Sequence, residues 1–117
     1  MKALLCKEFG PPETLSYEEI DDPVLKDGYV VVDIHSASVN FPDVLMIQDK
    51  YQFKPPLPFS PGGESSGVIT EIGNGVEGFN QGDRVIVSSG WGSFAEKILV
   101  EPSTFCLLYT SDAADEE

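Results

Sequence analysis

Hydrophobic and polar positions alternate in short runs through most of the chain, a pattern typical of β-strands rather than of amphipathic helices. The runs are rich in β-branched residues and are separated by glycine, proline and acidic residues that favour turns. We expect six strands, over residues 2–8, 14–20, 29–39, 68–72, 84–88 and 94–100. The chain is therefore predicted to be mainly β.

The longest of these runs, residues 29–39, indicates which side chains would enter the core. Because alternate residues of a strand point to opposite faces, Val30, Val32 and Ile34 would face inward. The opposite face would carry polar residues, with Val31 as the one aliphatic exception.

The next segment has the features of a helix N-terminus. Asn40 supplies a capping side chain, Pro42 lies in the first turn, and Asp43 places an acid near the positive end of the helix dipole. We predict one short helix from there to about Gln48. Residues 51–59 contain three prolines and are expected to form an extended loop, of a kind that often lines binding sites.

Residues 58–85 hold seven of the eleven glycines and are the most turn-rich part of the chain. Glycine tolerates positive φ and close backbone approach, so this stretch would wind tightly around the strand at 68–72. A dinucleotide-binding turn would need GxGxxG followed by a helix and an acidic residue, and the sequence has no such motif. The stretch is therefore predicted to be scaffolding rather than a phosphate cradle.

Composition narrows the possible functions. With 20 acidic and 7 basic residues among 117, the chain has a formal net charge of −13 and no basic cluster of the kind that nucleic acid requires. No apolar run approaches the roughly 20 residues of a membrane span, and Lys7 and Glu8 interrupt the start too soon for a signal peptide. We expect a soluble, cytoplasmic domain that binds neither nucleic acid nor membranes.

The two cysteines, Cys6 and Cys106, lie at opposite ends of the chain. They form no CxxC pair and have no second ligand set nearby, so neither a structural zinc site nor a disulfide framework is indicated. We expect two small buried thiols, with a disulfide between them as the alternative.

One long segment carries a pattern specific enough to indicate a family. It is residues 37–85, ASVNFPDVLMIQDKYQFKPPLPFSPGGESSGVITEIGNGVEGFNQGDRV. The segment resembles the N-terminal part of the medium-chain dehydrogenase/reductase superfamily, and above all its zinc-independent quinone oxidoreductase, or zeta-crystallin-like, branch. The resemblance covers roughly residues 1–105. It implies that residues 1–106 form a GroES-like, partly open β-barrel with one short helix.

In that family a Rossmann domain follows the barrel and binds the nucleotide, and a chain of this length cannot contain both. The resemblance therefore implies the N-terminal part of a longer enzyme, with the Rossmann domain absent. Residues 107–117 are mostly small and acidic and match no part of the family. We expect them to be a disordered tail or an artefact of a truncated gene.

Two positions bear on metal binding. The zinc-dependent alcohol dehydrogenases of the superfamily have a cysteine and a histidine where this sequence has Asn40 and Gly63. An amide and a glycine are not competent zinc ligands, and Glu64 alone could not hold an ion. We therefore expect no metal site.

The resemblance also implies a reaction and its residues. In quinone oxidoreductases, hydride passes from NADPH to a quinone or an electron-poor alkene in a cleft between the two domains. By resemblance, Asn40 would hydrogen-bond near the nicotinamide or the substrate, and Phe41 would join it in contacting the cofactor. Asp43 would support that turn, and Tyr51 would line the substrate pocket. The parent enzyme would be a homodimer, and this part alone would be inactive.

Each of these residues also has a purely structural interpretation. Asn40 fits a helix cap, Asp43 a first-turn acid and Tyr51 an aromatic cover on the barrel. Glu64 is expected to satisfy backbone donors in the glycine-rich turn. For the whole chain, the alternative to an oxidoreductase is a stand-alone GroES-like binding module without catalytic activity.

Overall fold

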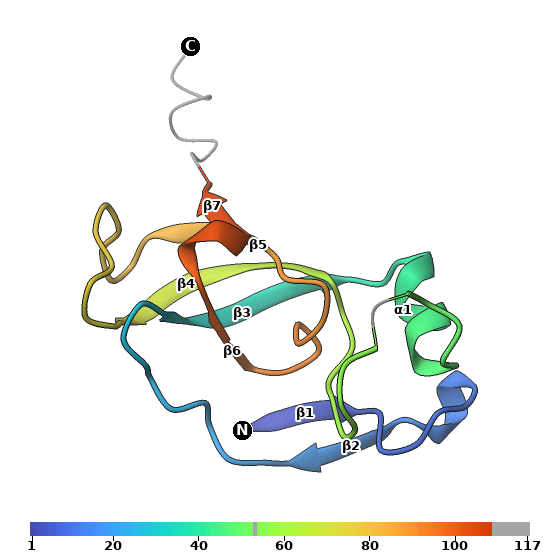
Figure 1. Ribbon diagram of the computed structural model, residues 1–117. Coiled ribbons are helices and arrows are strands. Elements are labelled where there is room, and N and C mark those ends of the chain that lie inside the picture. Colours follow the sequence, from blue (N-terminus) through green and yellow to red (C-terminus); the bar gives the residue numbers. More distant parts are fainter. Residues whose placement is uncertain (53, 109–117) are drawn as a thin grey trace.

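The fold is built around an antiparallel sheet of five strands (Figure 1). The computed structural model describes residues 1–52 and 54–108. Within this part the strand order of the sheet is β6-β3-β4-β5-β7. Its members are β3 (Val30–Ser38), β4 (Glu64–Ile72), β5 (Arg84–Ser88), β6 (Lys97–Val100) and β7 (Phe105–Leu107).

A second sheet pairs β1 (Lys2–Leu5) with β2 (Ser16–Glu19) and lies below the first in Figure 1. Two isolated bridges connect β1 and the residue after it to loops of the larger sheet, Ala3 to Ala95 and Cys6 to Phe59. The two sheets do not join into a closed cylinder. The predicted class is confirmed: the fold is mainly β, a partly open barrel with a short helix.

That helix is α1 (Phe41–Ile47), which sits at one end of the sheet, directly after β3 (Figure 1). Two 3₁₀ turns, η1 (Pro12–Thr14) and η2 (Pro102–Thr104), complete the regular structure of the described residues. None of the helices in the described part of the chain has the length and apolarity that crossing a membrane requires.

The main core gathers hydrophobic side chains from all five strands of the larger sheet. Its buried members are Val30, Val32, Ile69, Val85, Val87, Ile98, Val100 and Phe105. Ile34 packs against this cluster, as expected. Val31, which was expected on a polar face, is fully buried too. The start of β3 is therefore covered on both faces, which is why it reads as an unbroken run of valines rather than as an alternation.

β4 begins four residues earlier than the pattern predicts, at Glu64. The added part, through Gly67, faces inward with small residues only, so it gives no hydrophobic signal. Gly67 lies so close to β3 that a Cβ built there would collide with the backbone carbonyl of Asp33. Glycine is thus required for the two strands to approach at this point.

β7 was not predicted, and it forms one edge of the sheet. Phe105 is buried and its ring lies 4.8 Å from that of Phe79, centroid to centroid. Leu107, the first residue of the expected tail, pairs with Val85. The tail from residue 109 onward lies outside the described residues.

Both cysteines are free thiols. Cys6 is fully buried, as expected, and burial raises the pKa of its thiol. Cys106 is exposed, so the prediction of a second buried thiol was wrong. It lies on β7, the short edge strand, where the neighbouring Phe105 points into the core instead.

Candidate functional site

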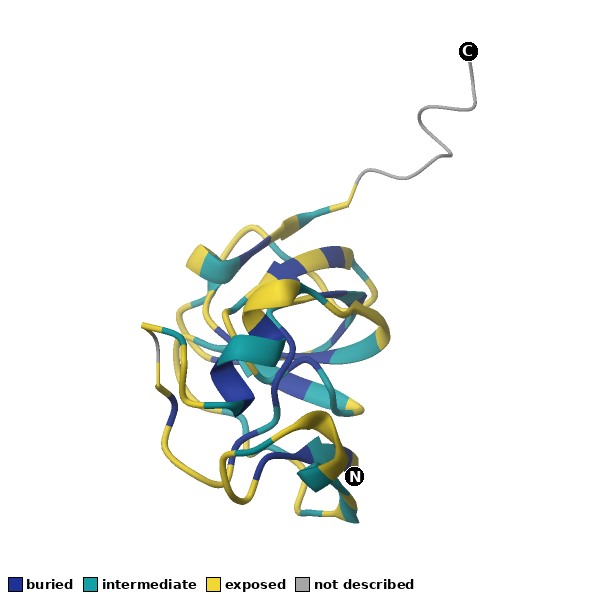
Figure 2. Cartoon of the chain, turned by 90° about the vertical axis from the view of Figure 1, so that its right-hand side faces the viewer, coloured by how far each residue is buried: buried dark blue, intermediate teal, exposed yellow. Residues whose placement is uncertain are grey.

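The site lies where β3 ends and α1 begins, and a second hydrophobic cluster fixes the helix there. Met46 and Ile47 of α1 pack with Cys6 and Phe59, and Tyr51 covers the cluster from the side. In addition, the backbone carbonyl of Ile47 accepts a hydrogen bond of 2.8 Å from the amide of Gly10. Loops before and after the helix thus hold it against the barrel (Figure 2).

The turn into α1 is closed by Asn40 and Asp43, and the side chain of Asp43 makes the return bond of a capping box, to the backbone amide of Asn40. The backbone amide of Asn40 donates to Oδ2 of Asp43 at 2.8 Å, and the amide of Asp43 donates to the carbonyl of Asn40 at 3.0 Å. Asp43 is only 5% exposed. Its carboxylate therefore holds the turn, and an acid at this end of the helix also suits the dipole.

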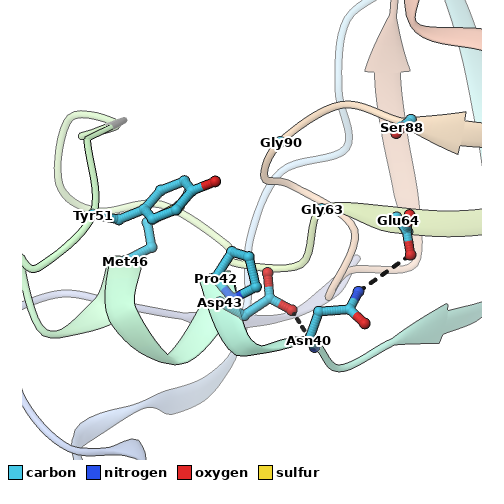
Figure 3. A pocket seen from close by; sticks show the side chains of 9 residues that line it. All are labelled: Asn40, Pro42, Asp43, Met46, Tyr51, Gly63, Glu64, Ser88 and Gly90. Carbon is cyan, nitrogen blue, oxygen red and sulfur yellow. Dashed lines mark hydrogen bonds between the residues drawn. The ribbon is translucent and has the colours of Figure 1, made fainter.

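The side-chain amide of Asn40 reaches from this turn toward β4 (Figure 3). Its nitrogen donates to Oγ of Ser38 at 3.0 Å and to Oε1 of Glu64 at 3.2 Å. The hydroxyl of Ser38 donates to the same Oε1 at 3.1 Å. Glu64 was expected to satisfy backbone donors, but it accepts from these two side chains instead. The register of the sheet causes this, because Ser38 and Glu64 are paired residues of β3 and β4.

A pocket of about 430 Å³ opens beside this network. Its walls come from the start of α1, the start of β4 and the turn after β5. Tyr51 lines it from the helix side, with its ring extending into the pocket and away from α1 (Figure 3). The full lining is Asn40, Pro42, Asp43, Met46, Tyr51, Gly63, Glu64, Ser88 and Gly90.

The structure thus brings together three of the four predicted site residues, Asn40, Asp43 and Tyr51. Phe41 is not among them, because it is 72% exposed at the first position of the helix and does not line this pocket. The roles assigned to all four residues stay predictions.

Sequence reasoning gave no site role to six of the lining residues: Pro42, Met46, Gly63, Glu64, Ser88 and Gly90. Met46 had a detectable signal, since it follows Asn40 and Asp43 on the same side of a short helix. Ser88 and Gly90 had none, because they reach the pocket only through the pairing of β5 with β4.

The donor set of the pocket does not fit a zinc ion. Its side chains offer an amide, a phenol, a hydroxyl and two carboxylates, one of which is committed to the backbone of Asn40. Neither a thiolate nor an imidazole lines it, whereas structural and catalytic zinc sites are built mainly from these. Across residues 1–52 and 54–108, no three His, Cys, Asp or Glu side chains are grouped so that they could hold a metal ion.

This topology, with a pocket at the corner of β3 and α1, defines a barrel domain of the GroES-like class. The family described as the alcohol dehydrogenase GroES-like domain matches residues 26–110, and the chain belongs to that family.

Its relatives confirm the resemblance to the quinone oxidoreductase branch. Quinone oxidoreductase-like protein 2 of Mus musculus is 40% identical over 103 residues, which cover 88% of this chain and 29% of that protein. Quinone oxidoreductase of Homo sapiens is 37% identical over 106 residues, covering 89% and 32%. The chain therefore spans about three tenths of the length of the curated relatives it matches.

Solved structures show the same fold. A probable oxidoreductase from Mycobacterium abscessus superposes with a TM-score of 0.85 at 38% identity, over 92% of this chain and 34% of that one. A mycobacterial protein solved in complex with NADPH gives a TM-score of 0.83 at 26% identity, over 100% of this chain and 37% of that one.

Proposed function

We propose that this chain is the N-terminal catalytic-domain part of an oxidoreductase that transfers hydride from NADPH to a quinone or an electron-poor alkene without zinc. The observation that carries the proposal is the pocket beside Gly63 and Glu64, where Asn40, Asp43 and Tyr51 meet without a zinc-binding donor set. The relatives named quinone oxidoreductase and the mycobacterial neighbour solved with NADPH support the reaction and the cofactor.

In this proposal NADPH, when bound, supplies the hydride, and the residues of this chain supply one wall of the site. Tyr51 covers the substrate and excludes water, and Asn40 orients the reacting groups by hydrogen bonding. Asp43 keeps Asn40 in place through the helix turn. These residues therefore mainly position the substrate and the cofactor, which is what hydride transfer requires of the protein.

The same proposal includes a cytoplasmic, homodimeric parent protein. A stand-alone binding module is the competing hypothesis. It is less favoured, because the mouse and human relatives and the Mycobacterium abscessus neighbour described above are named as oxidoreductases. Fold alone does not separate the two.

Tyr51 gives the test. In the parent protein, made from this sequence together with its downstream coding sequence, we expect NADPH-dependent reduction of a quinone, followed as loss of NADPH absorbance. Tyr51→Ala should lower kcat/KM by at least about tenfold, because a poorly held substrate leaves its reactive geometry.

Tyr17→Ala is the matched control, since Tyr17 is 68% exposed on β2 and does not line this pocket. Its kcat/KM should equal that of the unaltered protein. Equal kinetics for both variants would remove Tyr51 from the site. A parent protein that reduces neither quinones nor enones would favour the binding module.

A further inference from the structure

Ser38, Asn40 and Glu64 form a closed hydrogen-bonded trio at the edge of the pocket. All three side chains meet at Oε1 of Glu64, with donor–acceptor distances between 3.0 and 3.2 Å. Glu64 makes no ion pair with a lysine or arginine among the described residues. The hydrogen bonds of its carboxylate therefore go to the trio rather than to a surface salt bridge.

The charge of Glu64 determines how the Asn40 amide is oriented. An ionised carboxylate accepts hydrogen bonds and has no proton to donate, so the end of the amide that faces it must be the nitrogen. Ser38 is satisfied at the same time, because its hydroxyl accepts from Asn40 and donates to Glu64. The carbonyl end of the amide is consequently turned away from Glu64. An apolar residue at position 64, which has no acceptor, would leave this choice open.

The backbone sets the positions of the three side chains, whose hydrogen bonds are exposed to solvent. Ser38 at the end of β3 pairs with Glu64 at the start of β4, and the backbone amide of Asn40 donates to Asp43. Hydrogen bonds to a charged group are the stronger ones in proteins. The Asn40 amide therefore has its two acceptors without any ligand.

We propose that Glu64 is a positioning residue of this site, which acts through Asn40 by fixing the orientation of its amide toward the pocket. The inference rests on the proposed oxidoreductase function and deepens it, since the resemblance gave Glu64 no part in the reaction. Glu64 does its work without contacting the reacting atoms, and Ser38 assists it.

A spectroscopic test requires no activity. In the 117-residue chain, the side-chain amide protons of Asn40 should give two well-separated NMR signals, because both have an acceptor. Glu64→Leu should shift both signals, while Glu64→Gln, whose side-chain oxygen still accepts, should restore them in large part. Glu71→Leu is the control, because Glu71 is an exposed glutamate on the same strand. Signals that stay unchanged in Glu64→Leu, with the backbone spectrum intact, would overturn the proposal.

The kinetic test uses the parent oxidoreductase. Glu64→Leu should lower kcat by about tenfold with little change in KM, because the substrate still binds but faces a misplaced amide. In an Asn40→Ala background the same change should have no further effect, since the two residues act as a unit. An equal loss in both backgrounds would show that Glu64 acts independently of Asn40 and would contradict the proposal.

The two tests distinguish a failure of the pairing between Glu64 and Asn40 from a failure of the oxidoreductase function. Shifted Asn40 signals in a protein whose parent reduces no quinone or enone would sustain the pairing of Glu64 with Asn40 and contradict the oxidoreductase function. If the parent is active but the Asn40 signals do not shift in Glu64→Leu, the oxidoreductase function is supported and the pairing of Glu64 with Asn40 is contradicted.

Discussion

Gly63 is one of the two positions on which the proposed metal-free reaction rests, and the backbone there leaves room for a Cβ. A Cβ built on it would come no closer than 3.4 Å to the carbonyl oxygen of Gly90, which is ordinary van der Waals contact. Its backbone is also outside the left-handed region that favours glycine. The fold therefore tolerates a side chain at the position where zinc-dependent relatives place a histidine, so the missing imidazole follows from the sequence and not from backbone geometry.

We therefore predict that Gly63→Ala changes the free energy of unfolding by less than about 1 kcal/mol, as is usual for unstrained positions. Gly67→Ala, four residues further along the chain and inside β4, should cost at least about 3 kcal/mol, because its methyl group would collide with the backbone of β3. Urea denaturation of the two variants gives the comparison. Similar midpoints would show that the close approach of β3 and β4 does not depend on glycine.

At the scale of the elements, strands with an aliphatic signal could be predicted and strands without one could not. β3, β5 and α1 were placed within two residues, since valines and a helix-capping sequence mark them. The first half of β4 is made of a glutamate, two serines and a glycine, and it is buried through pairing with β3 and β5. β7 is three residues long and depends on β5 for its hydrogen bonds. These segments are specified by their partners, which a local pattern does not contain.

The β1–β2 hairpin carries a charge pair whose effect on pH dependence can be derived. Nζ of Lys7 lies 2.7 Å from Oε2 of Glu18, which also accepts from the hydroxyl of Ser16 at 2.6 Å. These hydrogen bonds, that from Lys7 first, lower the pKa of Glu18 below its ordinary value of 4.5. A lowered folded-state pKa means that the ionised form favours folding. The contribution is present above pH 4.5 and is lost as the pH falls through the folded-state pKa.

We predict that Lys7→Ala raises the pKa of Glu18 toward 4.5 and reduces the loss of stability on acidification below that pH. An NMR titration of the Glu18 side chain measures the shift directly. Lys50→Ala is the control, because Lys50 takes part in none of the ion pairs found within residues 1–52 and 54–108. A Glu18 that titrates alike in both variants would show that the pair is not formed in solution.

At the scale of the whole molecule, the sequence predicted three residues that line the pocket but not how they are brought together. The resemblance singled out Asn40, Asp43 and Tyr51, and the fold places all three at one pocket. It did not foresee that Glu64 would join Asn40, because the contact spans 24 residues and depends on the register of β3 with β4. Phe41 was expected, by resemblance, to contact the cofactor together with its sequence neighbour Asn40. It does not line the pocket, because a helix turns adjacent residues to different sides.

The central claim is that this pocket supports hydride transfer without a metal, and chelation of the parent protein tests it most directly. The protein would be dialysed against a strong zinc chelator, its metal content measured, and its NADPH-dependent quinone reduction compared before and after. We predict an unchanged rate at less than stoichiometric zinc, since Asn40 and Gly63 replace the ligands that zinc needs. A rate that is lost on chelation and restored by added zinc would contradict the account.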